Sequence, residues 1–480
     1  MHKLWKQYMG LSKQTKSVVW FILCAILQKA ISFITVPIFT RLLSSEEYGV
    51  YSLYLAWLQI LTIFTSLYLY YGVSNNALTK FESDRDAYIS SMQGLTLSIT
   101  IFYFIIYIIA PSTWSEFFGL SPVFLFLMFA ELLVGPSLQF WAVKQRFEFR
   151  YRLLVVITLA KSIINPVLGI ILVYFAKEKD VARVSSSVIV EVLFCVTIMI
   201  LQFIKGKKII SSKYWKYALG LAIPLLPHYL SSVVLNQADR IMIGYMVGKS
   251  EVAFYSIACN IGALVQIVTT AIINSFTPWI YQKIKVGDYS NIKSTINFLC
   301  VIVAIVSFGL MLCSPELVLI FGSHEYMSSV YVIPPVAASV FFMFLYNVLA
   351  IPQFYFEQTR FLAISSIVAA IMNIILNFIF IKLYGFIAAG YTTLICYLLY
   401  SFGHYLVTRI VISKYSGCKF FYDKKFIASL SMLVIIIGIV CNSLFEYWYI
   451  RYAIILVICI CGIIMRKQII LVTMGLRKKD

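Results

Sequence analysis

Charged residues are scarce in this chain of 480 residues: they make up 12% of it, whereas hydrophobic residues make up 61%. So little polar surface cannot cover a water-soluble globule of this length. Charge-free runs such as 88–110 and 426–444 are long enough to cross about 30 Å of hydrocarbon as helices. The alternation over ~10 residues that marks transmembrane β-strands is not the pattern. The composition therefore predicts an all-α integral membrane protein.

The sequence also lacks the spacings that support covalent or metal chemistry. Its ten cysteines lie mostly inside apolar runs, where cysteine behaves as a small hydrophobic residue, and they show neither disulfide nor zinc spacing. No nucleophile with its base, no carboxylate pair and no metal cluster is recognisable. We therefore predict that the protein is not an enzyme and that it has no catalytic residues, no metal and no cofactor.

Positive charge is in excess, with 39 Lys and Arg against 20 Asp and Glu. Of these 39 cations, 29 fall in connections on the side of the N-terminus and 8 in connections on the opposite side. By the positive-inside rule, both termini are cytoplasmic. No basic stretch has the interleaved aromatics that nucleic-acid binding needs, so the net charge of +19 indicates topology and anionic headgroups rather than nucleic acid.

The apolar runs predict about fourteen transmembrane helices joined by short connections, with no soluble domain. The first run follows four lysines and is as long as a full span, which indicates a retained helix rather than a cleaved signal. The predicted spans are 17–39, 48–72, 88–110, 121–143, 153–176, 185–204, 218–246, 250–274, 294–313, 329–352, 361–381, 386–406, 426–444 and 452–470.

An internal repeat organises these helices. The motif RLLSSEEYGVYSL at 41–53 returns as KSEVAFYSI at 249–257, which sets Tyr51 over Tyr255, and a second pair sets Asn165 over Asn373. The repeat predicts two six-helix lobes related by an axis along the membrane normal, with a substrate cavity between them. The lobes are 1–217 and 218–406, and 407–480 adds two further helices and a cytoplasmic tail.

Three stretches carry a resemblance to a known family: VPIFTRLLSSEEYGVYSL, LNQADRIMIGYMVGKSEVAFYSIACNIG and NIILNFIFIKLYGFIAAGYTTLICYLL. In their order and spacing the chain resembles the Wzx-type polysaccharide flippases of the multidrug/oligosaccharidyl-lipid/polysaccharide exporter superfamily. The resemblance implies a bacterial inner-membrane protein that moves an undecaprenyl-diphosphate-linked oligosaccharide to the outer leaflet by alternating access, for O-antigen, capsule or exopolysaccharide biosynthesis. It also implies membrane lipids, a polysaccharide polymerase and a chain-length regulator as partners.

Two other functions stay open. A multidrug or small-metabolite exporter of the same superfamily would be favoured by an acidic or apolar cavity. A membrane polysaccharide polymerase is the second alternative, but that class usually places its active residues in a large outer loop, and the outer connections here are short.

Lys29 is the first candidate for substrate binding. It lies 12 residues into the first predicted helix, roughly 18 Å deep, where a lysine facing lipid costs about 2.5–3.5 kcal/mol. Gln28, Ser32 and Thr35 form a polar stripe beside it. In related lipid-linked precursor flippases the positions of Lys29 and Thr35 tend to be arginine, so Thr35 departs from that pattern. The alternative role of Lys29 is a structural ion pair with Glu131.

Further candidates are polar or charged residues within the predicted spans or at their ends. Helical stripes that include Ser52 and Gln59 in the first lobe, and Ser256 and Asn260 in the second, suit either a cavity lining or close helix packing. His228, between two prolines, indicates a bent helix rather than a proton site. The remaining candidates are Arg41 and Lys161 for substrate binding, and Asp239 and Arg240 for either a gate or mutual pairing.

Overall fold

The computed structural model describes residues 10, 12–358, 360–415, 420–457 and 460. This part of the chain is helical without a strand, which confirms the predicted all-α class. Thirteen of its helical segments are long and apolar enough to span a membrane, and a shorter apolar helix, Trp448–Val457, follows them. The last predicted span, 452–470, lies mostly outside the described residues.

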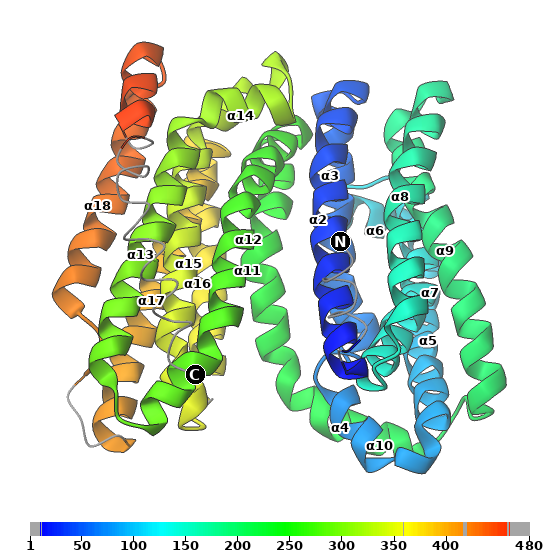
Figure 1. Ribbon diagram of the computed structural model, residues 1–480. Coiled ribbons are helices and arrows are strands. Elements are labelled where there is room, and N and C mark those ends of the chain that lie inside the picture. Colours follow the sequence, from blue (N-terminus) through cyan, green and yellow to red (C-terminus); the bar gives the residue numbers. More distant parts are fainter. Residues whose placement is uncertain (1–9, 11, 359, 416–419, 458–459, 461–480) are drawn as a thin grey trace. The chain divides into compact units, whose positions relative to one another are not determined.

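Figure 1 labels the helices in chain order. They are α2 (Lys13–Leu42), α3 (Ser45–Ser66), α4 (Val73–Lys80), η1 (Glu82–Asp84), α5 (Arg85–Ile109), α6 (Pro111–Phe118), α7 (Pro122–Phe147), α8 (Tyr151–Phe175), α9 (Lys179–Gly206), α10 (Ser212–Ala222), η2 (Ile223–Leu225), α11 (Leu226–Met246), α12 (Lys249–Lys285), α13 (Tyr289–Leu312), α14 (Ser314–Phe321), η3 (His324–Tyr331), α15 (Ile333–Tyr355), α16 (Arg360–Tyr384), α17 (Ile387–Tyr415) and α18 (Lys424–Ser443).

One predicted span is broken by proline. The segment Ser212–Met246 consists of α10, the short 3₁₀ turn η2 and α11. Pro224 and Pro227 have no N–H to donate and clash with the preceding turn, so a regular helix cannot pass through both. The bent helix expected around His228 is therefore present, and the His228 ring lies 2.9 Å from Ser366 Oγ.

The repeated motif begins α3 with a capping box. The Ser44 hydroxyl accepts a hydrogen bond from the Glu47 N–H at 3.2 Å, and the Glu47 carboxylate accepts one from the Ser44 N–H at 2.7 Å. Two backbone donors at the helix start are thus satisfied by side chains. The same end of α3 lies against the start of α12: a Cβ added at Gly49 would overlap the carbonyl oxygen of Lys249.

The chain forms two compact units. The first comprises Met1–Ser256, Phe321–Tyr326 and Ala363–Ala389, and the second comprises the remaining segments, Ile257–Ile320, Met327–Leu362 and Gly390–Asp480. In the first unit α9 packs against α7 and α8, α2 packs against α8, and α3 packs against α11. In the second unit α13, α15 and α18 pack together. The lobes 1–217 and 218–406 follow the repeat and stay a prediction.

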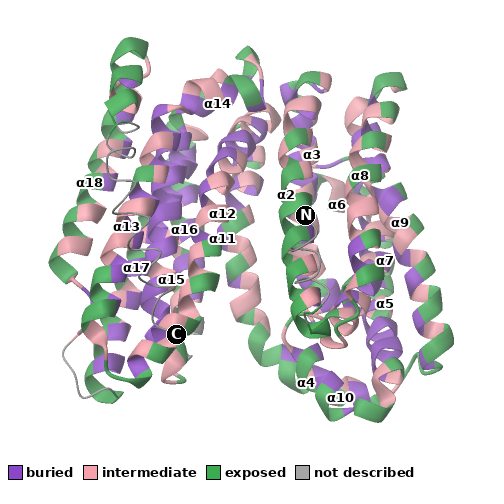
Figure 2. Cartoon of the chain, in the orientation of Figure 1, coloured by how far each residue is buried: buried purple, intermediate pink, exposed green. Residues whose placement is uncertain are grey.

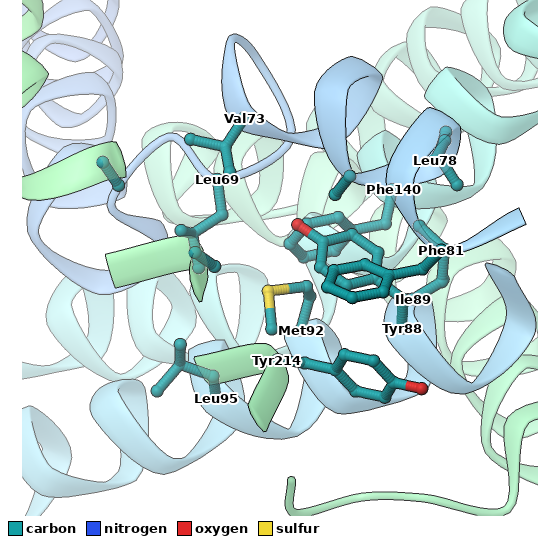
Figure 3. Packing of buried hydrophobic residues seen from close by; sticks show 13 residues of the cluster. Leu69, Val73, Leu78, Phe81, Tyr88, Ile89, Met92, Leu95, Phe140 and Tyr214 are labelled. Atoms are coloured by element: carbon teal, nitrogen blue, oxygen red, sulfur yellow. The ribbon is translucent and has the colours of Figure 1, made fainter. Parts of the chain in front are cut away.

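An aromatic core joins α4, α5, α7 and α10 in the first unit (Figure 3). The Phe81 ring lies edge-on to Tyr214 at 5.0 Å between centroids and stacks on Tyr88 at 5.8 Å. Met92 and Phe140 are fully buried beside them. Buried aromatic pairs in such geometry stabilise a fold beyond their area burial, so this cluster fixes one end of the first unit.

Burial differs sharply between helices, as Figure 2 shows. In the second unit α15 is buried along most of its length. In the first unit α2 buries only Ser17, Cys24, Phe39 and Thr40, and its other residues are exposed or half-buried. Most of the α2 surface therefore lies outside the packed interior of its unit.

Candidate functional site

A polar cavity of about 490 Å³ lies among α2, α7, α8 and α9 in the first unit. Its volume is within the range of about 300–1,000 Å³ that is typical of small-molecule sites. Three cations and no carboxylate line it. The lining residues are Gln28, Ile31, Ser32, Thr35, Leu138, Gln139, Ala142, Arg146, Leu154, Thr158, Lys161, Ser162, Asn165, Pro166 and Arg183.

Arg183 is the most buried cation of this cavity, with 6% of its surface exposed. Its Nη1 donates hydrogen bonds to Asn165 Oδ1 at 3.0 Å and to Ser187 Oγ at 2.9 Å, and its Nη2 donates to the Tyr51 hydroxyl at 2.9 Å. These acceptors come from α8, α9 and α3. The guanidinium therefore joins three helices at one wall of the cavity.

The partners of Arg183 hold its charge without neutralising it. The guanidinium carbon lies 4.1 Å from the centroid of the Phe39 ring and 4.6 Å from that of Tyr51, within reach of a cation–π interaction. Its Nε is buried and has no hydrogen-bond partner. Among the described residues no carboxylate lies within ion-pair distance of Arg183. An arginine held in this way is suited to attract an anion.

Lys161 and Arg146 complete the positive lining. Lys161 on α8 forms an ion pair with Glu191 on α9, and the other Glu191 oxygen accepts a hydrogen bond from Cys195 Sγ at 3.1 Å. Arg146 lies near the end of α7 and is exposed. The predicted candidate Lys161 thus lines the cavity with its charge balanced.

The polar stripe predicted on the first helix lies at the same cavity. Gln28, Ser32 and Thr35 all line it, and Gln28 Nε2 donates to Ser162 Oγ at 3.3 Å across the seam between α2 and α8. Thr35 donates to the Ser32 carbonyl at 2.8 Å. Polar groups at this helical spacing therefore face α8.

Lys29 itself is exposed and is not among the lining residues of this cavity. Within the described part of the chain, no ion pair joins it to Glu131. Glu131 instead accepts a hydrogen bond from the Tyr54 hydroxyl at 2.9 Å. The structural role considered for Lys29 is thus absent from this conformation.

A second polar assembly links α3 to α11. Arg240 Nη1 donates to Gln237 Oε1 at 3.0 Å, and Gln237 Nε2 donates to Gln59 Oε1 at 2.9 Å. Arg240 Nε also donates to Ser256 Oγ at 3.1 Å. Two predicted residues, Gln59 and Arg240, are thus connected through one glutamine that the sequence analysis did not single out.

Asp239 is buried, with 2% of its surface exposed. Its carboxylate accepts hydrogen bonds from the Tyr255 hydroxyl and from Asn377 Nδ2, and Asn377 also donates to Asn373 Oδ1 at 3.1 Å. The network connects α11, α12 and α16. It satisfies the carboxylate of a residue that was expected either to gate or to pair with its neighbour.

The two networks use residues that the internal repeat sets in register. Tyr51 and Asn165 meet on Arg183, whereas their repeat partners Tyr255 and Asn373 belong to the network around Asp239. The tyrosine therefore accepts from a cation in the first copy of the motif and donates to an anion in the second.

Two predicted residues lie away from these assemblies. Arg41 is exposed near the end of α2, and its Nη1 donates to the Pro37 carbonyl at 2.7 Å. Asn260 lies on α12 in the second unit and is half-buried. Both stay predictions as substrate-binding residues.

Comparison with known proteins places the chain in a family. The family model described as polysaccharide biosynthesis protein matches residues 14–284, more than half of the chain, and a model described as MatE matches residues 224–379. A relative from Haemophilus influenzae, Lsg locus putative protein 1, is 23% identical over 285 residues, which cover 57% of this chain and 67% of that protein.

Solved structures share the fold. The lipid II flippase MurJ, in an inward closed conformation, is similar with a TM-score of 0.71 at 15% identity; the match covers 94% of this chain and 100% of that one. An inward-facing multidrug resistance MATE family transporter of the MOP superfamily gives a TM-score of 0.59 at 14% identity, covering 83% and 98%. The chain therefore belongs to the polysaccharide biosynthesis protein family, the Wzx-type flippases of the multidrug/oligosaccharidyl-lipid/polysaccharide exporter superfamily.

Proposed function

We propose that the chain moves an oligosaccharide linked to undecaprenyl diphosphate from the cytoplasmic to the outer leaflet by alternating access, for O-antigen, capsule or exopolysaccharide biosynthesis. The observation that carries the proposal is Arg183, a buried cation on the cavity wall whose contacts are neutral side chains. A diphosphate group supplies the opposite charge.

The chemistry of the cavity matches both parts of such a headgroup. A bare diphosphate cannot enter hydrocarbon without countercharge, because transfer of an isolated charge costs tens of kcal/mol by Born solvation. Arg183 and Arg146 supply that countercharge, and the amides and hydroxyls of Gln28, Ser162 and Asn165 are suited to sugar hydroxyls. The polyprenyl chain stays in lipid.

The comparisons support a lipid-linked substrate. The family is described by polysaccharide biosynthesis, and one structure of the same fold is titled a lipid II flippase. We propose an inner-membrane location with both termini cytoplasmic, a transporter role rather than an enzymatic one, and a polysaccharide polymerase and a chain-length regulator as partners.

The rival function is export of drugs or small metabolites. An exporter of cationic or apolar compounds needs an acidic or apolar cavity, whereas the one described here is lined by three cations and no carboxylate. Its lining therefore favours an anionic substrate.

The test uses a host whose own flippase gene is deleted, so that lipid-linked oligosaccharide accumulates in the cytoplasmic leaflet. Expression of this chain should restore surface glycan and clear the accumulated intermediate, whereas Arg183→Gln should not. Restored drug resistance without any change in the lipid-linked pool would instead identify a multidrug exporter.

A further inference from the structure

A basic hollow of about 640 Å³ lies on the first unit, at the end of α2 and α9 and at the junction of α7 with α8. Five cations line it and no carboxylate does. Arg150 is partly balanced, because Glu148 Oε2 lies 3.0 Å from its Nε. Arg152 and Lys205 have no carboxylate within ion-pair distance in the described part of the chain. The hollow therefore has positive charge to spare.

An apolar groove of about 420 Å³ continues from this hollow. The two share Trp141, Gln145, Arg150, Leu153 and Lys205, so they adjoin. Beyond the shared residues the groove is lined mostly by apolar side chains of α8 and α9, with Asp86 and Lys144 paired to each other at its basic end.

The groove opens toward lipid. Leu153, Leu193 and Leu201 line it and are 59%, 63% and 49% exposed, on helices that are long and apolar enough to span the membrane. Along α9 the lining runs from Leu193 to Lys205, twelve residues or roughly 18 Å at 1.5 Å per residue. That is close to the half-thickness of a hydrocarbon core of about 30 Å. The groove thus has the length of one leaflet.

From this arrangement we infer that the first unit binds an anionic phospholipid as a resident ligand, apart from any transported substrate. The phosphate-bearing headgroup lies in the basic hollow against Arg152 and Lys205, and one acyl chain lies in the groove along α9. Charge complementarity selects the headgroup, since a juxtamembrane basic cluster attracts anionic lipid. The apolar groove selects an amphiphile over a soluble anion, because only an apolar chain fills it favourably.

The site is separate from the polar cavity. The hollow and the groove share none of their lining residues with Arg183, Lys161 or the α2 stripe, apart from Leu153's helix neighbour Leu154 on the cavity side. Lipid binding can therefore be measured without any transport assay, and its outcome does not depend on the proposed function.

The experiment is a lipid titration of the full-length chain, purified and stripped of lipid, followed by native mass spectrometry. Phosphatidylglycerol and phosphatidylcholine with identical acyl chains are the probes. The wild-type chain should bind phosphatidylglycerol more tightly, and Arg152→Gln/Lys205→Gln should reduce that preference roughly tenfold or more. Lys207→Gln/Lys208→Gln, which removes two exposed cations next to the site, should leave it within about twofold.

A second variant tests the groove. Thr197→Phe fills it and should weaken binding of both lipids while the ratio between them persists. Three results would overturn the inference: an equal loss in the Lys207→Gln/Lys208→Gln control, full competition by soluble glycerol phosphate, or displacement of phosphatidylglycerol by undecaprenyl phosphate at much lower concentration. The last would identify a substrate-entry site.

Discussion

Arg183 and Tyr51 lie 132 positions apart in the sequence, yet the guanidinium donates a 2.9 Å hydrogen bond to the phenol oxygen and stacks over the same ring. Tyr51 belongs to the repeated motif, and Arg183 lies in the first turns of α9. One task of the motif in its first copy is therefore to hold a cation at the cavity.

We expect Arg183→Gln to reduce glycan export at least tenfold, because it removes the buried charge that would bind the diphosphate. Arg183→Lys should fall between the two, since a lysine keeps the charge but cannot bond to α3, α8 and α9 at once. Export is measured as surface glycan per copy of protein. Tyr51→Phe is the matched control: it removes one hydrogen bond, about 1 kcal/mol, and keeps the ring. Normal export by Arg183→Gln would rule out this binding role.

Lys29→Ala should abolish export while expression and insertion stay near normal, because removing an intramembrane charge makes the helix easier to insert. Lys29→Arg should keep substantial activity, since the requirement is a fixed positive charge. The structure has no Lys29–Glu131 ion pair among the described residues, so stability should not depend on Glu131. An unstable Lys29→Ala that Glu131→Gln rescues would show a structural lysine instead.

Asp239→Ala should lower the free energy of unfolding by roughly 1–3 kcal/mol, because it leaves the Tyr255 hydroxyl and the Asn377 amide as buried donors without an acceptor. Thermal unfolding of purified protein in detergent provides the measurement. Glu82→Ala is the control, since Glu82 forms an exposed ion pair with Arg85 that contributes about 1 kcal/mol or less. Equal shifts in both variants would contradict a stabilising network.

Reporter tags should locate both termini and alternate connections in the cytoplasm. Tags after residues 80, 210, 285, 415 and 480 should be protected from an external label, and tags near 115, 180, 320 and 447 should react with it. The distribution of 29 cations against 8 is the reason. An external C-terminus would contradict the predicted number of spans.

Transport should respond to the membrane potential. A diphosphate with two negative charges gains about 2.3 kcal/mol per charge per 100 mV on moving to the positive, outer side. In vesicles at fixed potential, export should continue without a proton or sodium gradient, and it should rise as the potential is raised. Strict dependence on either gradient at constant potential would refute this.

The helices were predictable because membrane spans follow from long apolar runs. The polar stripe of Gln28, Ser32 and Thr35 was predictable as well, since its spacing places the three residues on one helix face, and all three line the cavity.

Arg183 was not predicted, for a reason that concerns a helix boundary. The hydropathy pattern began the sixth span at 185 and left Arg183 in an outer connection, but α9 begins at Lys179, with Asp180 in its first turn. An acidic residue there stabilises the helix start. The available signal was polar: Ser186 and Ser187 follow at three and four residues, and both accept hydrogen bonds from Arg183.

Contacts between distant segments could not be read from one sequence. Nothing local to Gln59 or Arg240 indicates that Gln237 connects them, because that depends on how α3 packs against α11. Tyr51 and Asn165 were recognised only as repeat markers, and their common partner became visible when α3, α8 and α9 were placed together.

The close approach of Gly49 to the Lys249 carbonyl bears on how easily the starts of α3 and α12 can part. Interlocked side chains must leave their rotamer wells before two helices separate, whereas a glycine opposite bare backbone has no side chain to withdraw. This contact is a smooth face rather than a set of teeth. Its opening therefore requires little activation, and a bulky residue at position 49 would hold the two helix ends permanently apart.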